Sequence, residues 1–375
     1  MKVIIIGAGE VGFYFAEWLS AERKEVVVLD TDEKALQEMT DHLDVQTLHG
    51  SGANPRLLEE AGIKKADLLL AVTNSDEVNF IACYMANFLA PQIEKVALIR
   101  QEDFAAFHEQ YSREMCSLNM VINPEVEVVR AILRLIQAPE VEEINDFAGG
   151  RIKMVGKKLP PQSPLHGLRL TQLPEKIDRN RMIVAALIRN DLLIIPKGKD
   201  SLQAGDFVYY VCQQHDLPAV QNLFGGKSGF AKNIMIVGGG RIGFRLAQML
   251  DKKNYNVKLV EMDGRRCQEI SARLHRVLVL QGFATDQAFF EQENAGSMDM
   301  VIAVTNDEEM NILSCLLAKR QGAQKTICRV DKFAYIPLVH AIGIDHVVSP
   351  RRSAINSIFP YIRRGKIIST VSIKG

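Results

Sequence analysis

The chain has 375 residues, of which 47% are hydrophobic and 24% are charged, as in a folded protein with more than one domain. Lysine plus arginine equals aspartate plus glutamate at 45 each. This balance argues against a general nucleic-acid-binding protein and against a basic membrane-surface protein. The first apolar run, residues 3–6, is too short for a signal peptide, and no segment approaches the roughly 18 apolar residues of a transmembrane helix. We therefore expect a cytoplasmic protein.

The cysteine pattern is also typical of a cytoplasmic protein. None of the six belongs to a Cys-x-x-Cys pair, and most lie in apolar runs: Cys83, Cys116, Cys212, Cys267, Cys315 and Cys328. This pattern favours reduced thiols in the core over a disulfide framework or a zinc site.

An internal repeat is the most informative feature of the sequence. "GAGEVG" at residues 7–12 returns as "GGGRIG" at residues 238–243, which is 231 positions later. Three further matches follow at offsets of 232, 229 and 226: "AVTN" at 71–74 and 303–306, Arg100 and Arg329, and Pro124 and Pro350. Offsets that change by a few residues are expected for insertions in surface loops. The sequence therefore predicts a tandem duplication of a domain of about 125 residues.

In chain order, each copy alternates short apolar runs with amphipathic helical segments. The runs are 3–6, 26–29, 45–48, 68–72, 96–99 and 120–122 in the first copy, and 234–237, 257–260, 277–280, 300–304, 326–328 and 347–348 in the second. Continuous rather than alternating apolar runs indicate strands covered on both faces, as in a parallel sheet. The predicted fold class is α/β, with two tandem doubly wound parallel-sheet Rossmann lobes and a small α+β subdomain between them.

The segment between the copies has a different character. An amphipathic helix over 125–137 follows Asn123-Pro124, and prolines and glycines then punctuate residues 151–212. Runs at 182–188 and 192–195 flank an Asn190-Asp191 turn signal, which predicts a β-hairpin. The predicted divisions are a first lobe at 1–124, a crossover helix at 125–138, a β-rich subdomain at 139–224, a linker at 225–231, a second lobe at 232–350, a second crossover helix at 351–365 and the start of a second small subdomain at 366–375.

The second crossover helix is bracketed by four arginines: Arg351, Arg352, Arg363 and Arg364. Packing of a helix with a solvated face explains them, and a membrane-surface role is the alternative.

Each glycine motif follows a strand and opens a helix. The first glycine permits the tight turn, the second lets the backbone approach a pyrophosphate, and the third allows the helix to pack closely on the strand. Amide groups and the dipole at the helix N-terminus would hold the phosphates. A carboxylate follows 18 residues after the third glycine in both copies, Asp30 and Glu261, where it suits a ribose 2'-OH and would repel the 2'-phosphate of NADP. We therefore predict NAD(H) binding; the alternative is that the glycines only satisfy a turn and the acids are solvated.

Further candidates lie at the carboxyl ends of strands, where ligands bind in this architecture. The first predicted site comprises Gly7, Ala8, Gly9, Glu10, Val11, Gly12, Asp30, Thr31, Ser51, Thr73, Asn74 and Arg100. The second comprises Gly238, Gly239, Gly240, Arg241, Ile242, Gly243, Glu261, Thr305, Asn306 and Arg329. For Arg100 and Arg329 the alternative is a surface ion pair with Asp103 or Asp331.

The two sites differ in charge at one position, where Glu10 corresponds to Arg241. A charge-assisted phosphate contact contributes roughly 1.5 to 3 kcal/mol. We therefore expect the second site to accept ATP or ADP better than the first.

The sequence predicts no catalytic residues and no metal site. Its eight histidines are scattered without partner spacing, and no known hydrolase motif appears. The nucleotide is therefore expected to act as a signal, and the chain is expected not to be an enzyme. An NAD-dependent oxidoreductase of unknown substrate is the main alternative, and a scaffold with vacant lobes is the third.

The sequence resembles the family of cytosolic regulatory subunits of Trk potassium-uptake systems, built from tandem RCK (also called KTN) domains. The resemblance covers nearly the whole chain, including "GAGEVG" with Asp30, "AVTNSDEVN", "IVAALIRNDLLIIPKG", "AGDFVYYV", "VGGGRIG" and "IAVTNDEEMNILSCLLAKRQGA". It implies NAD(H) on the Rossmann lobes with ATP or ADP as competing ligands. It also implies a homo-oligomer, a dimer or a tetrameric ring, at the inner face of the membrane beneath a potassium-channel subunit of the TrkH/TrkG type. Members usually carry a second small subdomain, of which residues 366–375 would be the start.

Overall fold

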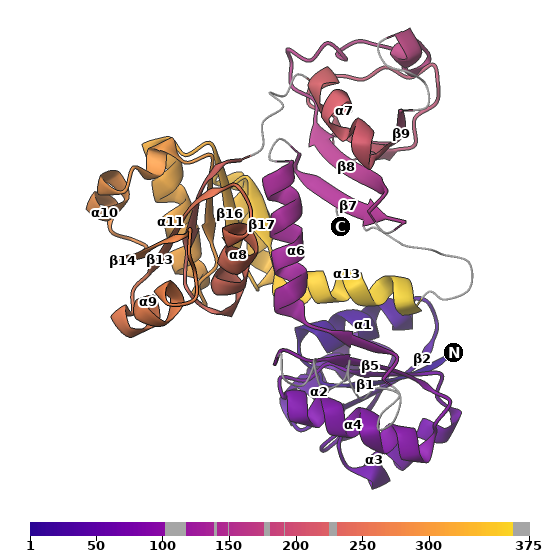
Figure 1. The fold of residues 1–375 in the computed structure, drawn as a ribbon. Coiled ribbons are helices and arrows are strands. Elements are labelled where there is room, and N and C mark those ends of the chain that lie inside the picture. The colour runs from indigo at the N-terminus through magenta and orange to yellow at the C-terminus, as the bar shows by residue number, and fades with distance from the viewer. Residues whose placement is uncertain are drawn as a thin grey trace. The chain divides into compact units, whose positions relative to one another are not determined.

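The computed structural model describes residues 1–101, 118–138, 141–148, 150–175, 181–190, 192–224 and 231–362 (Figure 1). The described chain forms two compact units. One holds residues 1–128 together with the helix α13 (Pro350–Ile362), and the other holds residues 129–348. The predictions for Asp103, Cys116, Asp191, Arg363 and Arg364 lie outside the described residues.

The first lobe is a doubly wound α/β domain. Its described elements are β1 (Lys2–Ile6), α1 (Glu10–Ala21), β2 (Glu25–Asp30), α2 (Glu33–His42), β3 (Gln46–His49), α3 (Pro55–Glu60), η1 (Ile63–Lys65), β4 (Leu68–Ala71), α4 (Asp76–Leu89), β5 (Glu94–Leu98) and β6 (Met120–Ile122). The strands form one sheet in the order β3-β2-β1-β4-β5-β6 with every pair parallel. The strand order reverses between β1 and β4, which is where such sheets bind ligands.

The second lobe repeats this arrangement. Its elements are β12 (Asn233–Val237), α8 (Arg241–Asp251), β13 (Asn256–Glu261), α9 (Gly264–Ser271), β14 (Leu278–Gln281), α10 (Gln287–Gln292), η4 (Ala295–Ser297), β15 (Met300–Ala303), α11 (Glu308–Gln321), β16 (Lys325–Arg329), η5 (Phe333–Tyr335), α12 (Ile336–Ala341) and β17 (His346–Val348). The parallel sheet has the order β14-β13-β12-β15-β16-β17. The predicted pair of parallel-sheet lobes is confirmed.

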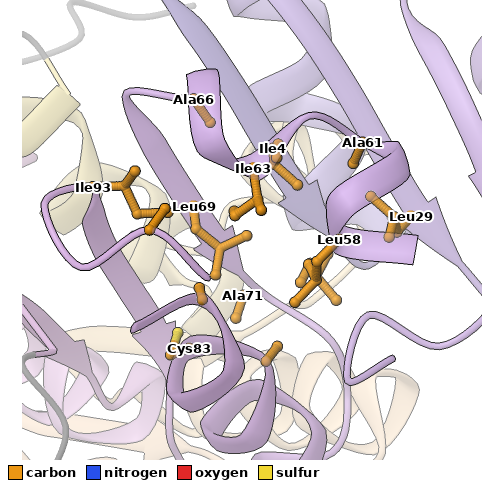
Figure 2. Packing of buried hydrophobic residues seen from close by; sticks show 14 of the residues in the cluster. Ile4, Leu29, Leu58, Ala61, Ile63, Ala66, Leu69, Ala71, Cys83 and Ile93 are labelled. Carbon is orange, nitrogen blue, oxygen red and sulfur yellow. The ribbon is translucent and has the colours of Figure 1, made fainter. Parts of the chain in front are cut away.

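The cores explain why the strands are continuous apolar runs. In the first lobe, Ile4, Leu29 and Leu69 from three neighbouring strands are fully buried. Figure 2 shows them packed with Leu58 of α3 and Cys83 of α4. Full burial of such a side chain stabilises the fold by about 1.5 to 3 kcal/mol. This packing fixes the sheet that carries the glycine turn.

The intervening subdomain is built on an antiparallel sheet. Strands β7 (Glu143–Phe147), β8 (Ile152–Lys158), β9 (Met182–Arg189), β10 (Leu192–Ile194) and β11 (Phe207–Gln213) have the order β10-β9-β11-β8-β7, followed by α7 (Leu217–Leu223). The predicted hairpin is confirmed, with Asn190 at φ 50 between β9 and β10. Two short 3₁₀ helices, η2 (Leu170–Glu175) and η3 (Gln214–Asp216), also belong to this subdomain.

The first crossover helix is α6 (Pro124–Gln137), which begins where the Asn123-Pro124 signal predicts. The Asn123 Oδ1 accepts hydrogen bonds from the amides of Glu125 and Val126 at 3.0 and 3.2 Å, and so caps the helix. Its Nδ2 donates to the Arg100 carbonyl at 2.8 Å, which ties the helix start to the end of the first sheet.

Two whole-chain predictions are addressed by the described residues. None of the helices in these ranges is long and apolar enough to cross a membrane. Five of the six cysteines are described, and each has a free thiol: Cys83, Cys212, Cys267, Cys315 and Cys328.

Candidate functional site

Two glycines in each turn are required by the fold itself. We call residues 7–12 the first glycine turn and residues 238–243 the second. Gly7 has φ +111, and a Cβ there would lie 3.0 Å from the Thr73 amide nitrogen. A Cβ on Gly12 would lie 1.8 Å from the Gly7 carbonyl oxygen. The second turn matches, because Gly238 has φ +105 and a Cβ on Gly243 would lie 1.9 Å from the Gly238 carbonyl.

The middle glycine of each turn has no such role. Gly9 has φ −68 and Gly240 has φ −64, values that any residue adopts. A Cβ at either position would meet no other heavy atom within 4 Å. The protein therefore does not need glycine at these two positions, whereas a ligand lying against the backbone would.

The helix N-termini beside these glycines present first-turn amides that the helices themselves do not use. Helix α1 makes its first backbone bond from the Phe13 nitrogen to the Gly9 carbonyl at 2.8 Å, and α8 from the Phe244 nitrogen to the Gly240 carbonyl at 2.9 Å. The preceding first-turn amides have no acceptor within the helix. Together with the helix dipole, they form a suitable site for a phosphate. The buried side chains of Val11 and Ile242 face the core, so these residues can offer a ligand only their backbone.

The acids at the ends of β2 and β13 hold the glycine turns in place. Asp30 accepts from the Ala8 amide at 2.5 Å and from the Asp32 amide at 2.8 Å. Glu261 accepts from the Gly239 amide at 2.8 Å and from the Asp263 amide at 3.0 Å. Both carboxylates are thus placed beside the turns, as predicted, and both also have a structural role that the sequence analysis missed.

The two copies keep this contact by a compensating change of size. Where the first turn has buried Ala8 beside Asp30, the second has Gly239 beside the longer Glu261. A Cβ on Gly239 would lie 3.0 Å from the Glu261 Oε2. The Ile270 Cδ1 would be closer still, at 2.6 Å, so a side chain at position 239 would be crowded by both Ile270 and the longer Glu261.

Thr73 and Thr305 are held by buried asparagines that the sequence analysis did not select. The Asn79 Oδ1 accepts from the Thr73 amide at 2.9 Å and lies 2.7 Å from its hydroxyl, while the Asn79 Nδ2 donates to the Leu98 carbonyl at 2.9 Å. Asn311 makes the equivalent contacts with Thr305 and with the Arg329 carbonyl. The sequence signal was the asparagine six positions after each threonine in the repeated "AVTN" segments.

Arg100, two residues after β5, and Arg329, the last residue of β16, lie over the loops that follow β4 and β15. Arg100 donates to the Asn74 carbonyl at 3.1 Å and forms an ion pair with buried Asp76 at 3.5 Å. Arg329 donates to the Asn306 Oδ1 at 2.9 Å and pairs with Asp331 at 2.7 Å. The alternative of an Arg329–Asp331 ion pair is confirmed, and Arg100 has an acidic partner that the sequence analysis did not consider.

Two candidates are more peripheral. Thr31 is exposed at the end of β2, where its carbonyl lies 3.1 Å from the His49 Nε2. The Ser51 hydroxyl accepts from the Ala53 amide at 3.3 Å. Thr31 is contacted by the last residue of β3, and Ser51 by its own loop.

The charges beside the two turns have partners that the sequence comparison could not foresee. Glu10 forms an ion pair with Arg351 of α13. At the second turn, Arg266 of α9 donates from Nε to the Gly239 carbonyl at 3.1 Å and also contacts Glu269 and the ring of Phe244. The position corresponding to Arg266 in the first copy is Ala35. The two sites therefore differ by more than the exchange of Glu10 for Arg241.

Comparison with known protein families finds two copies of one domain with a different domain between them. The TrkA-N domain family matches residues 3–124 and 234–350, and the TrkA-C domain family matches residues 155–225. The chain is 38% identical over 374 residues to the Trk system potassium uptake protein TrkA of Halomonas elongata, covering 100% of this chain and 82% of that protein. It is 36% identical over 371 residues to TrkA of Azorhizobium caulinodans, covering 98% and 81%.

Solved structures agree on the fold. The GsuK channel bound to NAD matches with a TM-score of 0.68 at 18% identity, over 96% of this chain and 63% of that one. The GsuK RCK domain matches with a TM-score of 0.65 at 18% identity, over 95% and 75%. On the strength of two TrkA-N domains, a TrkA-C domain and relatives of 36–38% identity along almost its entire length, this chain belongs to the TrkA family of Trk system potassium uptake proteins.

Proposed function

We propose that this chain is a nucleotide-sensing regulatory subunit that binds NAD(H) at both glycine turns and gates a membrane potassium-uptake channel. The observation that carries the proposal is the pair Gly9 and Gly240, where glycine is retained in ordinary backbone geometry with no neighbouring atom to exclude a side chain. The pyrophosphate would lie against these glycines and the first-turn amides of α1 and α8. Asp30 and Glu261 would accept hydrogen bonds from the ribose hydroxyls with the lone pairs that the turns leave free.

Family membership suggests the partner of this chain. Curated relatives carry the name of potassium uptake proteins, and structures with this fold include a channel bound to NAD and one bound to ADP. We infer a homo-oligomer, a dimer or a ring of four, that acts from the cytoplasmic face on a membrane subunit of the TrkH/TrkG type. Its role is regulatory rather than enzymatic. Coupling can be no larger than the difference in nucleotide affinity between the two channel states.

Potassium flux tests this function directly. The chain would be reconstituted with its membrane subunit in vesicles, and NADH, ADP and ATP would be added in turn. The matched control replaces both open glycines, Gly9→Asp and Gly240→Asp, which adds a Cβ with no other heavy atom within 4 Å and a carboxylate that would repel a bound phosphate. We expect flux to respond to nucleotide in the native protein and not in the control. If nucleotide changed the flux equally with the native protein and with the control, or if the native protein turned over NADH with a small metabolite, the proposal would be contradicted.

We also propose that ADP and ATP bind better at the second turn than at the first. Arg241 opens α8 where Glu10 opens α1, and Arg266 adds a second guanidinium beside Gly239. Arg241→Glu should reduce ATP affinity at the second turn about ten-fold or more, through one lost charge-assisted contact and one added repulsion. Calorimetric titration in a Gly9→Asp background measures it, and an unchanged affinity would refute the preference.

A further inference from the structure

The helix α13 follows the second sheet in sequence but packs on the first lobe. Figure 1 shows this last helix, in yellow, along α1 at the start of the chain. The ring of Phe359 lies 4.7 Å from Trp18 and 5.9 Å from Tyr14, measured between ring centroids. Eight positions earlier in both helices, Arg351 pairs with Glu10. Because the contacts advance together, α1 and α13 run parallel, with their N-termini at the same end.

This packing places the guanidinium of Arg351 beside Glu10, which belongs to the first glycine turn. Glu10 is the first residue of α1 after its N-cap Gly9, so it belongs to the same helix turn as the amides that would hold a pyrophosphate. A carboxylate alone at this point would repel the phosphates. Arg351 neutralises it and brings a planar, bidentate donor that matches phosphate geometry.

The ion pair is suited to exchanging partners. The side chains of Arg351 and Glu10 are 42% and 41% exposed, and solvent-exposed pairs are weak because water screens both charges. An arginine–phosphate contact is stronger, since it combines two parallel hydrogen bonds with a more highly charged acceptor. A phosphate bound on the first-turn amides would therefore compete successfully with Glu10 for the guanidinium.

We propose that Arg351 contacts phosphate in the first nucleotide site, and that its ion pair with Glu10 breaks when the diphosphate of a nucleotide binds. This inference rests on the proposed nucleotide-sensing function. It assigns a part of the first site to a helix that is covalently continuous with β17 of the second lobe, which ends at Val348. Occupancy of the first site would thus act on α13 directly, through its first turn.

The test is a set of calorimetric ADP titrations in a Gly240→Asp background, which leaves the first site as the one that binds. Arg351→Gln should weaken ADP about ten-fold, the loss expected for one charge-assisted contact, and Arg351→Lys should give an intermediate loss because a charge remains without the bidentate geometry. Glu10→Gln should strengthen binding, since the guanidinium no longer has a competitor. Arg352→Gln, one position along the same helix, is the matched control and should leave affinity unchanged.

The double variant Glu10→Gln with Arg351→Gln separates direct contact from charge neutralisation. If Arg351 contacts phosphate, its removal still weakens ADP when Glu10 is already neutral. An effect of Arg351→Gln that disappears in the Glu10→Gln background, or an affinity that Arg351→Gln does not change, would overturn the inference. Absence of ADP binding in the Gly240→Asp background itself would instead count against the proposed first nucleotide site, so the two failures are distinguishable. Thermal unfolding of every variant shows whether folding is retained.

Discussion

At the scale of single residues, the three glycines of each turn are present for different physical reasons. Gly7 and Gly12 are fixed by a positive φ and by the near contact of a Cβ with the Gly7 carbonyl, whereas Gly9 is free of both constraints. The same contrast holds in the second turn. The motif predicts these separate roles, and the structure adds the φ angles and Cβ distances that give Gly7 and Gly12 a steric reason to be glycine and Gly9 none.

The third glycine of each turn is therefore expected to be needed for stability. Gly12→Ala should lower the free energy of unfolding by about 1 to 3 kcal/mol or more, because its Cβ would overlap the Gly7 carbonyl and backbone cannot easily move aside. Gly243→Ala should do the same in the second lobe. Chemical denaturation measures both. Unchanged stability in either variant would mean that the turn is looser than its geometry implies.

Asp30 has a structural role in addition to its proposed binding role, and one substitution should affect both. Asp30→Ala should weaken NADH binding by about 1 to 3 kcal/mol through lost ribose hydrogen bonds, and should also lower the free energy of unfolding by about 1 kcal/mol because the Ala8 and Asp32 amides lose their acceptor. Fluorescence titration and denaturation of the same protein give the two numbers. Intact NADH affinity would count against the assignment of Asp30 to the first site.

At the scale of elements, the strands were predictable and the side-chain contacts between them were not. Twelve apolar runs predicted the strands of the two parallel sheets to within two residues at each end, because strands covered on both faces must be apolar throughout. The contacts of Asn79 and Asn311 were not predicted, because a polar residue in a predicted helix is usually exposed. Both are fully buried and bridge two strand ends.

Asp345, before β17, links three elements of the second lobe and predicts a pH dependence. Burial alone would raise the pKa of this carboxyl, but hydrogen bonds from Lys319 and the Thr326 amide and the charge of Lys325 together hold the pKa below its usual value. A lowered folded pKa contributes stability that is present above the unfolded value, near 4, and is lost as pH falls through the folded pKa.

We therefore expect Asp345→Asn to cost about 1 to 3 kcal/mol at pH 7 and to flatten the decline of stability as the pH falls below about 4. Denaturation across that range measures it, with exposed Glu309→Gln on the same lobe as the control. An acid decline as steep in the Asp345→Asn variant as in the native chain would be inconsistent with this network.

At the scale of the whole molecule, the repeat was visible in the sequence but the partner of its last helix was not. Glu10 was interpreted only as a negative charge where the second copy has Arg241, because nothing in the spacing places Arg351 beside a residue 341 positions away. Likewise, the apolar face of α13 was attributed to crossover packing without a known surface. Long-range contacts of this kind depend on how complete elements dock, which local patterns do not encode.

The docking of α13 predicts a long-range effect on stability. Phe359→Ala should destabilise the first lobe by about 3 kcal/mol, because it removes the ring that covers Tyr14, Phe15 and Trp18. Hydrogen exchange at the amides of α1 should accelerate in this variant, although the substitution lies near the end of the described chain. Unchanged exchange in α1 would contradict the packing of α13 on this lobe.

The number of NADH molecules bound per chain tests the central claim most directly. Gly9→Asp and Gly240→Asp each place an N-cap aspartate at a helix start without steric conflict, so neither should lower the melting temperature. Equilibrium titration should give two NADH per native chain, one in each single variant and none in the double variant. No NADH bound by the native chain, or two bound by the folded double variant, would contradict nucleotide binding at the glycine turns.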